Sequence, residues 1–94
     1  MNERICNKLE QLFNKLYPDY LYVSNYGYYL WVYKNTTNEL AIVIHGYGED
    51  YAPFEVILIK AEDDNTIYKT FLTYKDMEEY LKNDLIDELM VYGL

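Results

Sequence analysis

The fold is decided by the stretch Tyr20 to Lys34, YLYVSNYGYYLWVYK. Two of its segments, YLYVS (20–24) and YYLWVYK (28–34), contain the aromatic and β-branched residues that favour strands. Between them lies NYG, in which Gly27 can adopt the positive φ that a tight turn requires. The stretch therefore predicts a β-hairpin.

Side chains alternate between the two faces of a strand, so the hairpin also predicts what each face of a sheet carries. One face is apolar and suits a core; it carries Leu21, Val23, Leu30 and Val32. The other face is aromatic; it carries Tyr20, Tyr22, Tyr29, Trp31 and Tyr33.

The flanking segments complete the pattern. Before the hairpin, residues 2–18 place Ile5, Leu9, Leu12, Phe13 and Leu16 on one stripe of a helix that Pro18 ends. After it, turn residues separate three further strands, at 39–45, 54–61 and 66–72. Beyond Leu72 the helical period returns; its apolar face carries Met77, Tyr80, Leu81, Leu85 and Leu89. Thr73 and Asp76 resemble a capping box at its start, and Gly93 follows its expected end.

These elements predict an α+β fold in the order α-β-β-β-β-β-α, formed by one domain over residues 1–94. Two helices with one apolar stripe each suit a two-layer sandwich on an antiparallel meander of about five strands. The second face would then be open and aromatic. Aliphatic residues on both sides of the third and fourth strands extend it, at Ala41, Val43, Ile57 and Ile59. Such a patch is typical of an interaction or dimer surface. The alternatives are one helix on each face, or a sheet that curls over its own tyrosines.

The formal charge of −8 narrows the choice of partner. Nucleic acid and anionic membranes are disfavoured as direct ligands, because phosphates are bound by Lys and Arg, and Arg4 is the only arginine. A protein partner with a basic surface is favoured. We expect a cytoplasmic location, since no apolar run approaches the length of a membrane span and Cys6 cannot form an internal disulfide.

The segment His45-Gly46-Tyr47-Gly48 resembles an oxyanion loop of hydrolases. That chemistry requires a serine on a Gly-x-Ser-x-Gly elbow, whereas the only serine is Ser24, between Val23 and Asn25. We therefore expect both glycines to be turn residues in a long hairpin connection. Glu49 and Asp50 would be solvated at its tip.

No other motif points to catalysis or to metal binding. His45 has no second histidine at ligand spacing, so we expect a strand-end histidine bonded to backbone or solvent. Glu62, Asp63 and Asp64 lack the register of a calcium loop and predict a charged turn. Cys6 has no basic neighbour at i+3 or i+4 to stabilise a thiolate and predicts a small buried residue. We predict no catalytic residue, no metal site and no cofactor, and hence a protein that is not an enzyme.

The composition indicates a protein that binds another protein, and not an enzyme. Thirteen tyrosines and one tryptophan accompany sixteen carboxylates. Tyrosine offers large contact area at low entropic cost, and carboxylates can take the place of phosphates. The predicted partner-binding residues are Tyr22, Tyr29, Trp31, Tyr33, Glu49, Asp50, Glu62, Asp63 and Asp64.

In size, charge, α-to-sheet-to-α plan and acidic turns such as GED and EDDN, the chain resembles the small acidic inhibitors of phages, among them anti-CRISPR and anti-restriction proteins. The resemblance implies a stoichiometric inhibitor that occupies the nucleic-acid site of a host enzyme, in the host cytoplasm, without a cofactor. Three alternatives stay open: an immunity or antitoxin-type protein that neutralises a basic toxin, a domain whose tyrosine face forms a homodimer, and an enzyme of unrecognised type.

Overall fold

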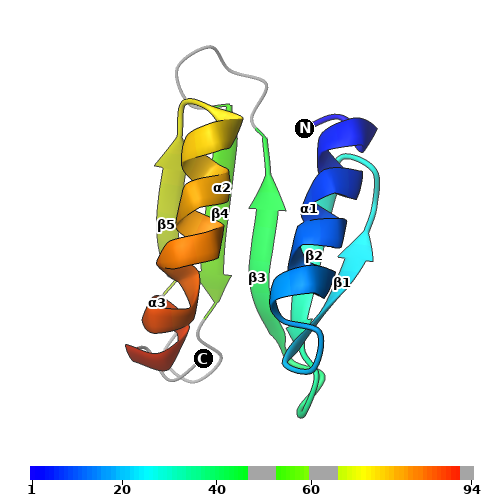
Figure 1. Ribbon diagram of the computed structural model, residues 1–94, viewed down its shortest axis with the longest axis vertical. Coiled ribbons are helices and arrows are strands. Elements are labelled where there is room, and N and C mark those ends of the chain that lie inside the picture. Colours follow the sequence, from blue (N-terminus) through cyan, green and yellow to red (C-terminus); the bar gives the residue numbers. More distant parts are fainter. Residues whose placement is uncertain (47–52, 60–65, 92–94) are drawn as a thin grey trace.

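The computed structural model describes residues 1–46, 53–59 and 66–91. Five strands form one antiparallel sheet in the order β1-β2-β3-β4-β5 (Figure 1), which confirms the predicted meander. None of the described helices is long and apolar enough to cross a membrane. The elements are α1 (Glu3–Leu16), β1 (Leu21–Asn25), β2 (Tyr29–Lys34), β3 (Leu40–His45), β4 (Phe54–Ile59), β5 (Thr66–Phe71), α2 (Tyr74–Asn83) and α3 (Leu85–Val91).

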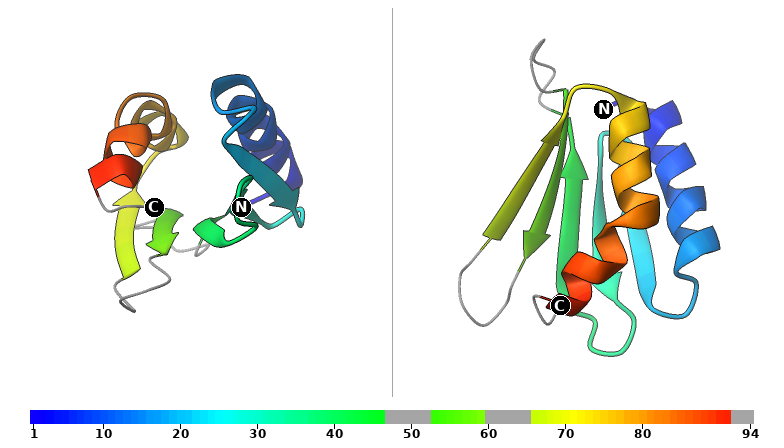
Figure 2. Two further views of the ribbon diagram at one scale, coloured as in Figure 1. Left: turned by 90° about the horizontal axis from the view of Figure 1, so that it is seen from below. Right: turned by 60° about the vertical axis from the view of Figure 1, so that its left-hand side comes forward.

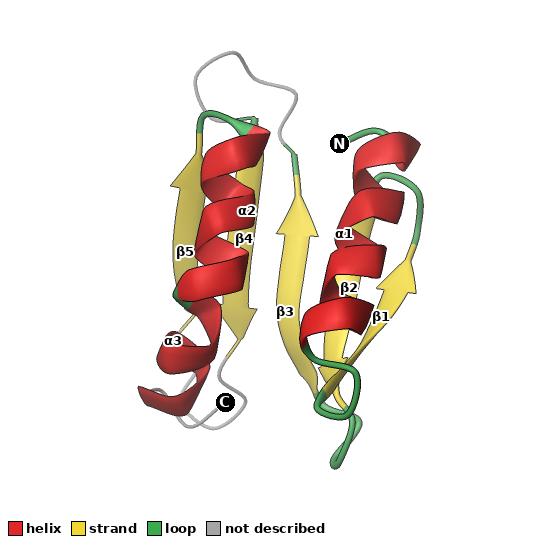
Figure 3. Cartoon of the chain, viewed as in Figure 1, coloured by secondary structure: helices red, strands yellow, loops and turns green. Residues whose placement is uncertain are grey.

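All three helices lie on the same side of the sheet (Figure 2), which makes the fold a two-layer α+β sandwich. Helix α1 covers the β1–β2 end, and α2 with α3 covers the β4–β5 end (Figure 3). The prediction of two layers is confirmed, and the alternative of one helix on each face is wrong.

The core lies between the helices and one face of the sheet. The sheet contributes aliphatic side chains that are completely buried: Leu30, Val32, Ile42, Ile44, Val56 and Leu58. The helices contribute the residues predicted from their apolar stripes, among them Leu9, Phe13, Met77, Leu81, Leu85 and Leu89. The hydrophobic period of the sequence thus identified the buried face of each element.

A side-chain cap marks the start of α1, and a long-range hydrogen bond holds its other end. The Asn2 side chain accepts a hydrogen bond of 2.9 Å from the backbone N–H of Ile5 and so caps the amino terminus. At the other end, the Tyr17 hydroxyl donates to the carbonyl of Leu81 at 2.7 Å and ties α1 to α2. Cys6 is fully buried, as predicted, and burial raises the pKa of its thiol.

The carboxyl-terminal region forms two helices, not the single helix predicted. The predicted cap at Thr73 is present, since its hydroxyl accepts from the backbone N–H of Asp76 at 3.1 Å. Asp84 separates α2 from α3 while its own N–H still bonds the carbonyl of Tyr80, and aspartate has a low helix propensity. Gly93 lies outside the described residues.

A bulge in β3 changes one predicted position. Val32 pairs with Ile42, but the next residue, Tyr33, pairs with Leu40, which leaves Ala41 as the extra residue. Ala41 is buried, so it does not belong to the open face on which strict alternation placed it. Leu40 takes the position opposite Tyr33 instead.

Candidate protein-interaction surface

The sheet face opposite the helices is the most distinctive surface of the molecule, and we call it the open face. Its central row crosses all five strands in register: Ser24, Trp31, Val43, Ile57 and Tyr68. Tyr68 is 61 % exposed, and the other four side chains are half-buried. The two lysines of the described strands, Lys34 and Lys69, occupy helix-side positions. The open face is therefore largely apolar and aromatic, without Lys or Arg among its described residues.

Three aromatic rings form a cluster at one end of β2. The Tyr26 ring stacks on Tyr29 with centroids 4.8 Å apart and meets Trp31 edge-on at 5.6 Å. Tyr29 and Trp31 are themselves 6.1 Å apart. Ring pairs at these separations attract beyond the effect of buried area. Tyr26 was not among the predicted site residues, although its position just before Gly27 could have indicated a ring that folds over the hairpin.

A second stack extends the cluster along the hairpin. Tyr22 and Tyr33 are opposite each other in the register, and their rings stack at 5.1 Å. Desolvation raises the pKa of Tyr33, and a hydrogen bond to Tyr26 contributes to the rise. The Tyr22 hydroxyl donates to Asn38 Oδ1 at 3.2 Å. The structure thus brings the predicted Tyr22, Tyr29, Trp31 and Tyr33 onto one face, with Tyr26 linking the two stacks.

The β1–β2 turn holds Tyr26 in place. Gly27 has φ +86°, the positive value predicted from the sequence, and its N–H donates to the Asn25 side chain at 2.9 Å. The Asn25 amide also donates to Asn7 Oδ1 of α1 at 2.8 Å. The turn is therefore fastened to the helix layer while Tyr26 lies over the open face.

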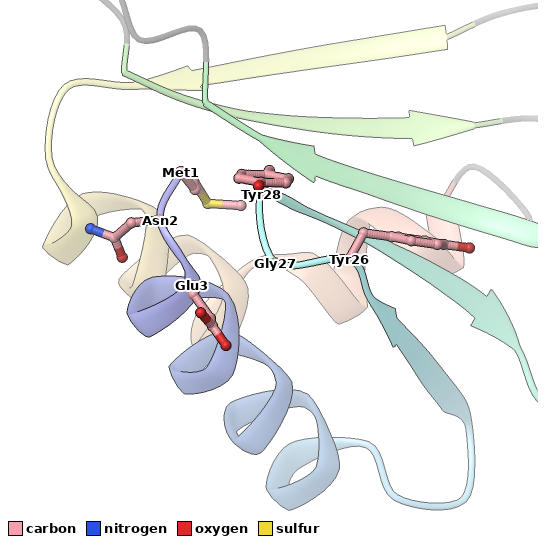
Figure 4. A pocket seen from close by; sticks show the side chains of 6 residues that line it. All are labelled: Met1, Asn2, Glu3, Tyr26, Gly27 and Tyr28. Atoms are coloured by element: carbon pink, nitrogen blue, oxygen red, sulfur yellow. The ribbon is translucent and has the colours of Figure 1, made fainter.

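Beside this turn the surface is hollowed over about 450 Å³ (Figure 4). The hollow is lined by Met1, Asn2, Glu3, Tyr26, Gly27 and Tyr28. Tyr28 is 74 % exposed, and the side chain of Met1 points toward its ring. The exposed aromatic surface thus continues from the sheet around the turn to the start of α1.

A histidine–carboxylate contact lies at the other end of the face from Tyr22 and Tyr33. His45 and Glu55 are opposite each other on β3 and β4, with Nε2 2.8 Å from Oε1. Glu55 is only 3 % exposed, and a carboxylate is almost never buried without a partner. The sequence predicts backbone or solvent beside His45, whereas the structure places this carboxylate there. A structural role for the pair follows from its burial.

Steric crowding, and not turn conformation, explains why residue 46 is a glycine. A Cβ on Gly46 would lie 2.6 Å from the carbonyl oxygen of Pro53 and 2.8 Å from the backbone nitrogen of Met1. Such distances exclude any larger residue without a shift of the backbone. Tyr47 and Gly48 lie outside the described residues, so the predicted turn is described only at Gly46.

The described residues do not assemble the chemistry of a hydrolase. Ser24 lies in the central row on β1, whereas His45 lies in the next row on β3. No group of three His, Cys, Asp or Glu side chains in the described part of the chain could hold a metal ion.

The net negative charge comes from one half of the chain. Residues 1–46 contain four acidic and four basic side chains, whereas residues 47–94 contain twelve acidic and four basic ones and so account for the whole charge of −8. Within α2 and α3 the carboxylates outnumber the lysines five to two. The predicted contacts Glu49, Asp50, Glu62, Asp63 and Asp64 lie outside the described residues, in the connections that flank β4. The aromatic clusters of β1 and β2 thus belong to the neutral half.

Comparison with known proteins assigns no family to this chain: no protein-family model, no curated protein and no solved structure matches it.

Proposed function

We propose that the protein is a non-enzymatic acidic inhibitor that binds a basic, nucleic-acid-binding surface of a partner enzyme, as anti-CRISPR and anti-restriction proteins do. The observation that carries the proposal is the open face: tyrosines and one tryptophan on a sheet face without Lys or Arg among its described residues, in a chain of charge −8. Tyrosine rings and hydroxyls suit arginine and lysine, which pack on aromatic faces and donate to oxygen.

The same face would bind nucleic acid poorly. Antiparallel sheets that hold single strands stack bases on exposed aromatic rings, but they also provide Lys or Arg for the phosphates. Here the strand lysines Lys34 and Lys69 belong to the helix side. A basic protein surface is therefore the better ligand.

The size of the face suggests that a partner reaches beyond it. Five strands of about six residues cover roughly 400 Å² of flat area, about half of the ~800 Å² that each partner of a stable complex contributes. The connections between β3 and β4 and between β4 and β5 carry Glu49, Asp50, Glu62, Asp63 and Asp64, which would supply the acidic margin. In this proposal the aromatic face provides contact area and the margin provides attraction at long range.

The test begins with capture of the partner from host lysate and continues with its association rate between about 50 and 300 mM salt, where screening changes strongly. We expect the rate to fall as salt rises, and Asp63→Asn with Asp64→Asn to lower it at low salt. Glu79→Gln with Asp87→Asn is the matched control, because it removes the same charge from exposed positions on α2 and α3. A rate independent of salt, equal effects of both double variants, or tight nucleic-acid binding by the protein itself would contradict the proposal.

A further inference from the structure

The outer edge of β1 presents backbone groups that β2 does not use. Asn35 N–H donates to the Tyr20 carbonyl at 2.9 Å, and Tyr26 N–H donates to the Tyr29 carbonyl at 3.1 Å. In an antiparallel pair such positions alternate with positions whose N–H and C=O point away from the neighbour. The backbone N–H and C=O groups of Leu21, Val23 and Asn25 therefore point away from β2. Leu21 agrees with this, since its N–H donates to Tyr17 at 3.2 Å and not to β2.

The two edge strands of the sheet, β1 and β5, differ in how well they are protected against pairing with another chain. On β5, Lys69 points inward to the helix layer, where its Nζ lies 3.1 Å from Glu88 Oε1. An inward-pointing charge is a device by which edge strands avoid pairing with another chain. The β1 sequence, LYVSN, has no charged residue and no proline, and its pairing with β2 is regular over all five residues. The β1 edge is thus the one suited to strand addition.

The distribution of charge favours a second copy of this chain at that edge. Residues 1–46, which include α1, β1 and β2, carry balanced charge. The acidic residues 47–94 include β4, β5, α2 and α3, at the opposite end of the sheet (Figure 1). Two copies joined at β1 would hold their acidic halves apart, whereas two copies joined at β5 would bring them together.

We propose that two copies pair β1 with β1, antiparallel across a two-fold axis at Val23, and form one continuous sheet. Val23 N–H of each copy donates to the partner's Val23 carbonyl, and Asn25 N–H donates to the partner's Leu21 carbonyl. On the open face Tyr22 lies beside the partner's Ser24, so the two aromatic clusters become neighbours. The pairing does not depend on the proposed function, but it doubles the face that a third protein could contact.

Sedimentation equilibrium tests the pairing, since the monomer has a mass of 11.3 kDa. Because one strand pair buries little area, we expect a reversible dimer between about 10 µM and 1 mM, as for small transient interfaces. Amide exchange at Val23 and Asn25 should slow as the protein concentration rises. The amides of β5 should not respond.

Two lysine variants localise the contact. Ser24 and Tyr68 lie in the same row of the open face, on β1 and β5 respectively. Ser24→Lys places a charge at the β1 edge and should raise the dimer dissociation constant at least ~10-fold, whereas Tyr68→Lys adds the same charge at the other edge and should change it less than ~3-fold. Thermal melts check that both variants fold.

Each remaining outcome overturns the pairing. A monomer at every concentration up to about 1 mM would do so, given the affinity expected of such an interface. A dimer that Tyr68→Lys or Trp31→Ala disrupts while Ser24→Lys does not would assign the contact to the open face. A dimer without protection at Val23 would exclude the β1 edge. A monomer, or a dimer without protection at Val23, leaves the binding of a basic partner unaffected, since that binding is measured separately by its salt dependence. A dimer through the open face would in addition compete with the proposed partner for that face.

Discussion

Replacing His45 with Ala tests whether the His45–Glu55 pair stabilises the sheet. Their side chains meet at 2.8 Å, with 29 % of the histidine and 4 % of the glutamate side chain exposed. A hydrogen bond to a charged group contributes about 1.5–3 kcal/mol, and at this burial solvent replaces it poorly. We expect His45→Ala to lower the free energy of unfolding by about 2 kcal/mol. In a domain of this size that loss corresponds to a Tm lower by roughly 8–16 °C.

The assay is urea unfolding followed by the fluorescence of Trp31, the only tryptophan. His45→Gln keeps a donor at this position and should cost less than about 1 kcal/mol, within the usual range for one neutral hydrogen bond. In a Glu55→Gln background, His45→Ala should cost about 1–2 kcal/mol less than in the wild type, as expected of residues in direct contact.

A coupling between the two positions below about 0.5 kcal/mol, the usual scatter for independent sites, would show that the pair does not stabilise the sheet. The same would follow if His45→Gln destabilised the protein as much as His45→Ala. Partner binding by His45→Gln should stay within a few-fold of wild type, because the pair is assigned a structural role. A hundredfold loss in a folded His45→Gln protein would instead assign His45 to the functional site.

Further predictions concern single side chains. Trp31→Ala should weaken partner binding by more than about 2 kcal/mol while the melt stays cooperative; a loss of stability of 3–5 kcal/mol without a binding defect would make Trp31 a core residue. Thr73→Ala should cost about 1 kcal/mol in urea unfolding, because it removes the α2 cap, and no change would refute that contribution. Desolvation and a hydrogen bond to Glu78 raise the pKa of Tyr74 from 10.0 to about 12. The stability that Tyr74 contributes should therefore be complete below pH 10 and be lost as the pH rises through about 12. The measurement is the difference between the absorbance titrations of the wild type and of Tyr74→Phe; a difference that titrates with the pKa of an ordinary phenol would refute the shift. Thiol reagents should modify Cys6 only at the rate of unfolding, since it is fully buried, and rapid modification of the folded protein would contradict this.

Much of the fold could be predicted because local patterns and the final structure agree. The period of Leu9 and Phe13 identified the buried side of α1, and the alternation around Leu30 and Trp31 separated the two sheet faces. Gly27 marked its turn because glycine adopts positive φ without steric cost. Where the period was interrupted, prediction failed: the bulge at Ala41 and the break at Asp84 are local deviations that the hydrophobic pattern tolerates.

The candidate surface was predictable only in outline. Strand parity placed Tyr22, Tyr29, Trp31 and Tyr33 on one face, but the sequence left open whether a helix covered that face. The contribution of Tyr26 depends on a turn conformation that folds its ring back over β2.

The sequence by itself determined the order of the strands and helices up to the break at Asp84, the helix cap at Thr73, and the excess of negative charge, because each depends on neighbouring residues or on composition alone. The tertiary structure decided which face of the sheet stays open, since the side on which a helix packs depends on the whole set of connections and apolar stripes. It also decided that His45 meets Glu55, ten residues away, because a cross-strand pair is set by the register of β3 and β4 and leaves no local pattern.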